Sequence, residues 1–205
     1  MVLRGRHLGK VSRVVTNLCV IAPVFFAAAA NADEFVFNFG GGPQFGSDQS
    51  TVETDQINKT FGIDYSFYRH DRSPRSGIRI GASYTYMSAN SDEYDTIHAV
   101  SIYPQLTLCP TSESWVRSLV PGNTDPFFYV RALGPSYISA NRLGSRQQSH
   151  NFAFQAQIGV GLQIYQNNNQ QVFVALSWKH FSNANLFEDN DGIDLPIVLN
   201  IGMLF

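Results

Sequence analysis

The sequence contains little cysteine and, after its first 32 residues, no long hydrophobic run. Its two cysteines are Cys19 and Cys109, and only Cys109 lies beyond that N-terminal segment. If the segment is removed on export, Cys109 has no partner for an intramolecular disulfide and is expected to act as a small apolar side chain. No later segment approaches the roughly 20 consecutive apolar residues of a spanning helix. A chain of this kind can cross a membrane only with strands.

Positive charge is scarce outside the N-terminal segment. Residues 1–32 contain four of the 14 Lys and Arg residues and none of the 16 Asp and Glu residues, so the remainder has a formal charge of −6. This balance argues against a nucleic-acid partner. No group of residues has metal-ligand spacing, and the run from Gly40 to Pro43 lacks the helix that a phosphate loop needs. We therefore expect no metal and no cofactor, and interpret the glycine run as a kink in a strand.

Residues 1–32 have the features of a secretory signal peptide: early positive charges, an apolar stretch and small residues at Ala30-Asn31-Ala32. The mature chain would then be residues 33–205, long enough for one domain. A retained membrane helix is the alternative, but the apolar stretch is short and contains Pro23. A lipoprotein anchor at Cys19 is disfavoured because Leu18 stands where a small residue is expected.

The rest of the chain alternates between apolar and polar residues with a period of two, which is typical of strands. The clearest segment has apolar residues at every even position from Phe152 to Ile164, with Gln and Gly mainly between them. The segment from Ile78 to Tyr86 repeats the pattern and places Arg79 on its polar face. Apolar outward and polar inward faces characterise outer-membrane barrels. A soluble sandwich or lipocalin-like barrel would invert these faces; the length of the runs favours spanning strands.

The pattern predicts an all-β fold, an eight-stranded antiparallel transmembrane β-barrel of the outer membrane. An even number of strands is what a closed single-chain barrel requires. The fourth and fifth strands are the weakest predictions because Pro104 and Pro135 each remove a ladder donor and because alternation there is poor. The eight strands are expected near 34–45, 57–69, 77–89, 94–109, 126–140, 151–166, 171–183 and 194–205.

The direction of the strands assigns the connections to the two sides of the membrane. With both termini in the periplasm, the connections at 70–77, 110–125 and 167–170 are periplasmic. Two of them are short, as such turns usually are, whereas 110–125 is too long for a simple turn. The last strand is predicted to carry one apolar row that ends at the terminal aromatic Phe205, a feature similar to the insertion signal of outer-membrane barrels. The members of this row are Ile193, Leu195, Ile197, Leu199, Ile201, Met203 and Phe205.

Two polar residues continue the lipid-facing row of the seventh strand. His180 and Ser182 follow Trp178 at alternate positions, so their side chains point the same way and an imidazole can reach the hydroxyl. The strand runs outward, which places both at its extracellular end. Polar side chains on a lipid-facing surface gain nothing unless they pair or react. The alternative is that both residues lie at headgroup level as part of the aromatic belt.

The sequence that follows decides between these interpretations. From His180 to Asp194 the chain is HFSNANLFEDNDGID. This stretch resembles the signature of the lipid A 3-O-deacylase family (PagL), a His-x-Ser-Asn segment followed by an Asn-Asp-Gly turn and a Glu. The matching residues are His180, Ser182, Asn183 and Ala184, then Asn190, Asp191 and Gly192. Asp194 stands at the family's acidic position, and Asn185 replaces a residue that is usually Gly.

The resemblance implies a serine esterase that acts on lipid A, or lipopolysaccharide, among the lipids of the outer leaflet. Ser182 would attack the acyl ester at the 3-position and release a 3-hydroxy fatty acid, with His180 as base and an acid to orient it. Asp194 is the expected acid. The oxyanion donors and shaping residues are expected among Asn183, Ala184, Asn190 and Gly192. A homodimer is left open.

The position of Asp194 creates a geometric requirement. Strict alternation back from Phe205 puts Asp194 on the face opposite the lipid-facing row, so it must lie in a loop or at a bulge. We expect Gly192 to help by adopting a positive φ. Two other functions remain open: a small structural or adhesion barrel without enzymatic activity, and an outer-membrane phospholipase, which uses a His and a Ser in a larger barrel.

Overall fold

The fold was obtained as a computed structural model that describes residues 34–45, 52–73, 76–91, 94–110, 124–166, 170–188 and 190–204. The predicted signal peptide at 1–32, most of the 110–125 connection and Phe205 lie outside these residues. No helix in the described part of the chain is long and apolar enough to span a membrane.

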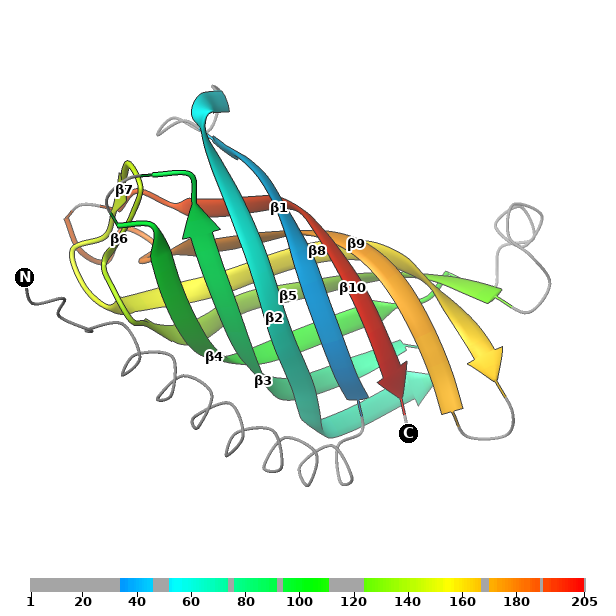
Figure 1. Ribbon diagram of the computed structural model, residues 1–205. Coiled ribbons are helices and arrows are strands. Elements are labelled where there is room, and N and C mark those ends of the chain that lie inside the picture. The colour runs from blue at the N-terminus through cyan, green and yellow to red at the C-terminus, as the bar shows by residue number, and fades with distance from the viewer. Residues whose placement is uncertain are drawn as a thin grey trace, which may run out of the picture. The chain divides into compact units, whose positions relative to one another are not determined.

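Eight antiparallel strands close into a barrel, as the alternation predicted (Figure 1). Neighbours around the wall follow the order β1-β10-β9-β8-β5-β4-β3-β2, and β1 pairs with both β10 and β2. The barrel strands are β1 (Glu34–Phe45), β2 (Val52–Ser73), β3 (Ser76–Ala89), β4 (Thr96–Leu108), β5 (Thr124–Ile138), β8 (Phe152–Gln166), β9 (Gln170–Ser182) and β10 (Ile193–Leu204). A separate hairpin consists of β6 (Arg142–Leu143) and β7 (Arg146–Gln147).

The two ends of the barrel are distinguished by the register. Glu34 pairs with Leu204, so the first and last strands begin and end together at what we call the terminal end. Gln171, near the start of β9, also pairs with Leu204, and therefore Ser182 at the other end of β9 lies at the opposite end. We call that the loop end; the hairpin β6–β7 lies there (Figure 1).

Strand β4 corrects one prediction, because its alternation is complete rather than poor. Its outward residues include Val100 and Ile102, both more than half exposed, and its inward residues include Ser101 and Tyr103, both sealed. The pattern was obscured in the sequence because apolar residues also occupy the inner face near the loop end. Pro104 points outward in regular register with Ile80. A residue without a backbone N–H is tolerated at this position, because the irregular part of the β4–β5 pairing lies beside it.

The fifth strand does contain the irregularity that its poor alternation suggested. The β5–β8 register shifts between Arg131 and Gly134, and Leu133 adopts a φ of 53°. A bulge of this kind leaves one strand a residue longer than its partner and turns the following side chains. After the bulge, the side chains of β5 again alternate between the outward and inward faces, as on the adjacent strands.

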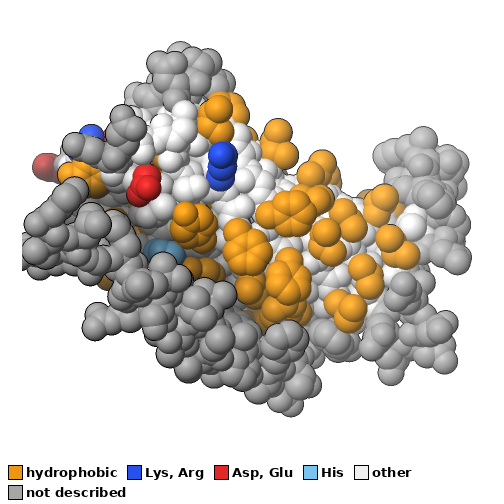
Figure 2. Space-filling model, in the orientation of Figure 1, with side chains coloured by type: hydrophobic (Ala, Val, Ile, Leu, Met, Phe, Trp, Pro, Cys, Tyr) orange, Lys and Arg blue, Asp and Glu red, His pale blue; other side chains and the backbone are white. Residues whose placement is uncertain are grey.

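The outer wall is apolar, as expected for a barrel in the outer membrane. Figure 2 shows hydrophobic side chains spread over the strand wall on one face, with the charged side chains toward the loop end. The most exposed apolar residues of the wall include Phe67, Val100, Ile102, Tyr137, Val160, Leu176 and Ile197. This surface belongs against hydrocarbon, because it would be costly to leave in water.

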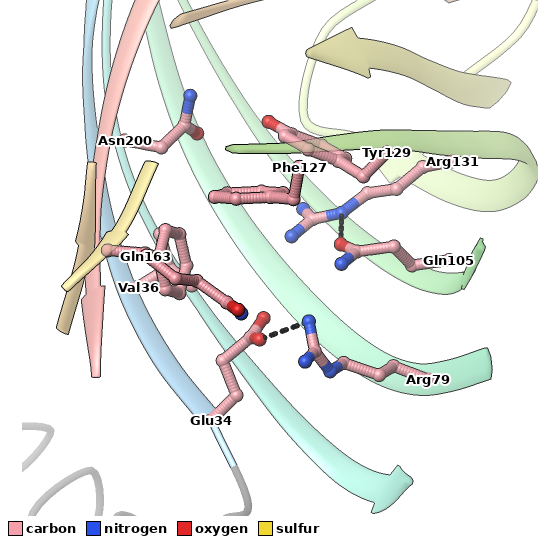
Figure 3. Close-up of a pocket in the computed structure, with 10 residues that line it drawn as sticks. Glu34, Val36, Arg79, Gln105, Phe127, Tyr129, Arg131, Gln163 and Asn200 are labelled. Carbon is pink, nitrogen blue, oxygen red and sulfur yellow. Dashed lines mark hydrogen bonds and ion pairs between the residues drawn. The ribbon is translucent and has the colours of Figure 1, made fainter. Parts of the chain in front are cut away.

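The middle of the interior is a sealed polar layer. Arg131 lies 2.5 Å from Asp64 and also bonds Gln105 and Gln157, while Tyr103 stacks under its guanidinium at 3.8 Å. Nearer the terminal end Arg79 and Glu34 are 2.6 Å apart across a cavity of only about 10 Å³ (Figure 3). Such a space holds at most about one water molecule. The interior is therefore a packed core and not a channel.

Apolar clusters close the interior above and below this layer. At the loop end the members are Met87, Ala89, Ile97, Ala99, Ile138, Leu143, Ala153, Phe181, Ile193, Leu195 and Val198. At the terminal end they are Val36, Phe127, Tyr129, Phe173, Ala175 and Leu204. The inward face is thus polar in the middle layer and mixed toward both ends, where apolar clusters lie among buried polar residues such as Glu34 and Gln44. The loop-end cluster packs densely against the inner side of the neighbouring wall.

Candidate active site

Strands β9 and β10 place the predicted residues together on the outer wall at the loop end. Ser182 is the last residue of β9, and His180 lies two residues before it on the same outward face. The residues on either side of His180 point inward and are fully buried: Phe181 in the loop-end cluster and Lys179 in the polar layer. The inward anchors on either side of His180 fix the backbone from which it projects.

A bulge in β10 brings Asp194 to the same outward face. Leu195 pairs with Lys179 and Val198 with Ser177, so three steps along β10 match two along β9. The extra residue falls around Pro196, which cannot donate to the ladder and is at home at a bulge. Asp194 therefore lies within β10, not in the loop before it, and pairs with His180 on β9.

The same bulge corrects the predicted apolar row of the last strand. Ile193 and Leu195 were expected to face lipid, but both are fully buried inside the loop-end cluster. Ile197, Ile201 and Met203, beyond the bulge, are exposed as expected. Alternation holds on both sides of the bulge and changes phase across it, which periodicity alone could not locate.

His180 and Asp194 form a direct contact, with 2.9 Å between the ring Nδ1 and Oδ1 of the carboxylate. Trp178 donates from its indole Nε1 to the same oxygen at 3.1 Å. Asp194 is almost sealed, whereas 13% of the His180 side chain is exposed. A carboxylate on Nδ1 fixes which ring nitrogen carries the proton, and leaves Nε2 to act as a base.

Gly192 has a different role from the one predicted. It is not among the glycines with positive φ. Instead, its Cα packs directly on the His180 ring, and a Cβ there would lie 2.3 Å from the ring Cε1. Glycine is required because the imidazole occupies the space of a side chain.

The loop after Ser182 contains two residues with a positive φ. Ala184 and Asn185 adopt φ values of 56° and 58°. Asparagine tolerates the left-handed region better than most residues, which accounts for Asn185 where the family pattern usually has Gly. Asn190 closes this turn: its Oδ1 accepts from the Asn183 N–H at 2.8 Å, and its Nδ2 donates to Asn185 Oδ1 at 2.8 Å.

The hairpin β6–β7 and the residues after it fix the segment that precedes Asp194. The Asp191 N–H donates to the Gln147 carbonyl at 3.0 Å, and Gln148 Nε2 donates to the Asp191 carbonyl at 2.9 Å. Gln148 itself is sealed. The Asn-Asp-Gly turn is thus held from the mouth of the barrel as well as from β9.

Sequence reasoning missed Gln44, at the far end of β1. Its Nε2 donates to Asp194 Oδ2 at 2.8 Å. Gln44 follows the glycine run interpreted as a kink, and the β1–β2 register does shift between Pro43 and Gln44. Nothing local in the sequence marks this residue, because the contact spans 150 positions and depends on barrel closure.

His98 on β4 lies against two tyrosine side chains. Its Nδ1 lies 2.7 Å from the Tyr84 hydroxyl, and its ring packs against Tyr86. It lies on β4, away from β9 and β10 in the barrel order. This aromatic group has the composition of an interfacial belt and adds nothing to the site.

Comparison with known proteins gives two kinds of match. The family model described as "Lipid A 3-O-deacylase (PagL)" matches residues 114–203, which include every residue of the predicted signature. The crystal structure of the outer membrane enzyme PagL covers 82% of this chain and 97% of its own, with 18% identity and a TM-score of 0.55. At this identity the structural match describes the fold alone.

A second solved structure, Neisserial surface protein A (NspA), covers 85% of this chain and 98% of its own with 12% identity and a TM-score of 0.48. A search of curated protein sequences finds no match.

Proposed function

We propose that this chain is a serine esterase of the lipid A 3-O-deacylase (PagL) family, a proposal supported by the match of that family's model to residues 114–203. Its substrate is the acyl ester at the 3-position of lipid A. The observation that carries the proposal is the 2.9 Å contact between His180 and Asp194 on the outward face of the barrel, two residues from Ser182.

The placement on the outer wall supports an enzymatic role over a structural one. A carboxylate on a lipid-facing surface is expensive unless it is paired. Here a bulge in β10 presents the Asp194 carboxylate to three hydrogen-bonding partners, which are His180, Trp178 and Gln44. An interfacial belt requires only the Trp and the His. A catalytic base explains the other two features, because Asp194 and the β10 bulge together orient the His180 ring.

The proposed mechanism combines the shared outward face of Ser182 and His180 with the contact between His180 and Asp194. Ser182 Oγ attacks the ester carbonyl carbon while His180 Nε2 takes its proton, and Asp194 stabilises the imidazolium. The bond from that carbon to the sugar oxygen then breaks, and the oxygen takes the proton from His180. Water, deprotonated by His180, releases the 3-hydroxy fatty acid from Ser182.

Among the expected oxyanion donors, we favour one in the turn after Ser182. The Asn183 N–H and the Asn190 amide already bond within the loop, so their contribution is to hold its shape. The backbone N–H of Ala184, at the start of the left-handed turn, is the donor we assign to the oxyanion. The strain of two successive positive φ angles is stored where the substrate binds.

The same proposal fixes the orientation in the membrane. With residues 1–32 removed as a signal peptide, both ends of the mature chain lie in the periplasm, and the loop end faces outward. Ser182 then lies at the level of the outer leaflet, where lipid A resides.

The test is mass spectrometry of lipid A from cells that express the wild type, Ser182→Ala or Ser88→Ala. Ser88 is an outward serine near the end of β3 and serves as the matched control. We expect the wild type and Ser88→Ala to remove one 3-hydroxyacyl chain, and Ser182→Ala to remove none. A wild type that leaves lipid A intact would favour the non-enzymatic barrel, and equal activity in Ser182→Ala would reject the nucleophile.

A further inference from the structure

A buried row of side-chain amides leads from the β6–β7 hairpin to Asp194. Gln56 and Asn58 project inward from β2, and Gln44 from β1, all at the loop end. Gln44 and Asn58 are fully buried and Gln56 nearly so. A row of polar groups in this position is costly unless every member is bonded, so its arrangement is constrained.

The direction of the hydrogen bonds along this row is fixed by one backbone group. The Ser145 N–H can only donate, and it donates to Gln56 Oε1 at 2.8 Å. Gln56 must therefore present its Nε2 to Asn58 Oδ1, at 2.8 Å. Asn58 in turn presents its Nδ2 to Gln44 Oε1, at 2.7 Å.

The last member of the row meets the proposed active site with a donor. Gln44 Nε2 donates to Asp194 Oδ2 at 2.8 Å and to the carbonyl of Gly192 at 3.0 Å. Gln44 Oε1 accepts from the Asp194 backbone N–H at 3.1 Å. One carboxamide thus holds the side chain and backbone of Asp194 and the glycine that packs against His180.

We infer that Gln44 is a positioning residue that holds the Asp194 side chain aimed at His180, and that Asn58 and Gln56 set the orientation of the Gln44 amide. This inference rests on the proposed esterase function. It explains how an Asp serves where the family pattern has the longer Glu. The bulge presents the short side chain to His180 through one oxygen, and Gln44 occupies the other.

Gln44→Glu separates this role from simple packing. The Glu side chain has the same length and keeps an oxygen to accept from Asn58 and from the Asp194 N–H. The Nε2 donor, which also bonds the carbonyls of Gly192 and Phe45, is replaced by a second carboxyl oxygen about 2.8 Å from Asp194 Oδ2. Two carboxyl groups at that distance repel each other unless they share a proton, so the variant should need a higher pH to reach its full rate.

The experiment measures kcat and KM from pH 5 to pH 9 on the full-length barrel in micelles containing lipid A. For Gln44→Glu we expect kcat to fall about 10- to 100-fold at neutral pH, the effect of losing one hydrogen bond to a charged group. KM should stay within about threefold, and the acidic limb of the kcat profile should move to higher pH.

Gln155→Glu is the matched control. Gln155 is fully buried and faces inward from β8 opposite Phe181, and within the described residues its amide has no partner. The substitution introduces the same buried carboxyl group without touching Asp194. We expect the acidic limb of this variant to stay in place. An equal shift would mean that any buried acid produces it, and would overturn the inference.

Gln44→Met provides a neutral variant of similar length that also lacks the donor. Its kcat per folded barrel should fall, with rates rising toward the wild type at high pH. Rates within twofold of the wild type in both Gln44 variants, or a loss that is equal at every pH, would overturn the positioning role. So would failure of both variants to fold, since Gln44 would then serve barrel assembly.

The controls keep the two proposals apart. An inactive wild type, or a Ser182→Ala variant as active as the wild type, rejects the esterase itself. A Ser182-dependent wild type whose rate is indifferent to Gln44 rejects only the positioning role.

Discussion

Two of the close acid–base pairs in the described part of the barrel lie on opposite faces of its wall. Inside, Asp64 and Arg131 are 2.5 Å apart and both sealed. Outside, Asp194 and His180 are 2.9 Å apart, and the imidazole is partly exposed. Arg131 is permanently charged and surrounded by bonded partners, so the inner pair can only fill and fix the core. The outer base can gain and lose a proton, so the outer pair can take part in chemistry.

The difference shows that proximity and burial of an acid do not by themselves mark a site. What distinguishes the outer pair is a base with a second nitrogen and a neighbouring hydroxyl on the same face. Substitutions that break each pair separately should therefore divide activity from stability.

Asp194→Asn should have the largest effect, on activity alone. We expect kcat to fall about 10³- to 10⁴-fold, because the amide no longer fixes the imidazole tautomer. The barrel should assemble as before, since the substitution keeps the shape of the side chain. Lipid A turnover and heat-dependent gel mobility measure the two quantities. Unchanged turnover would remove Asp194 from the mechanism.

Asp64→Ala should have the opposite signature. It leaves the Arg131 guanidinium buried without its carboxylate, at a cost of about 3–5 kcal/mol in the free energy of unfolding. The urea midpoint in micelles should fall, while turnover per folded barrel stays within about twofold. A specific loss of turnover at an unchanged midpoint would mean that the two pairs are not separate.

Gly192→Ala tests the packing of the outer pair. The added Cβ would lie 2.3 Å from the His180 ring and must displace it. A shift of about 1 Å at a catalytic group costs about 100-fold in rate. The measurement is kcat, with Gly202→Ala as a control, because Gly202 packs against Phe173 inside the barrel. Full activity in Gly192→Ala would show that the ring need not stay where it lies.

Trp178→Phe should have the smallest effect. It keeps an aromatic ring against His180 and removes only the donor to Asp194, worth about tenfold or less in kcat. Tyr129→Phe removes an inner hydroxyl that accepts from Gln157 and should leave kcat unchanged. Equal effects of the two substitutions would contradict the distinction between the faces.

Much of the fold could be predicted because the information is local. A period of two identified the eight strands, the fourth and fifth only weakly, and the faces of most of them, including the outward row that carries His180 and Ser182. The shared face of these two residues follows from their spacing along one strand, and the family resemblance supplied Asp194.

The remainder depends on geometry that alternation does not encode. The bulge at Pro196 turned Ile193 and Leu195 inward and Asp194 outward, against a strict period. Gln44 reaches the site only because β1 closes against β10, from the other end of the sequence. Gly192 was singled out for its conformation, but its φ is not positive and it packs against the His180 ring instead.

The central claim is that Ser182 is an activated nucleophile on the outer wall. Its most direct test is labelling of the folded barrel with a serine-reactive fluorophosphonate, followed by mass spectrometry of the peptide that contains residues 180–188. We predict one adduct, on Ser182, in the wild type and none in His180→Ala. An adduct of equal yield in His180→Ala, or none in an assembled wild type, would contradict the account.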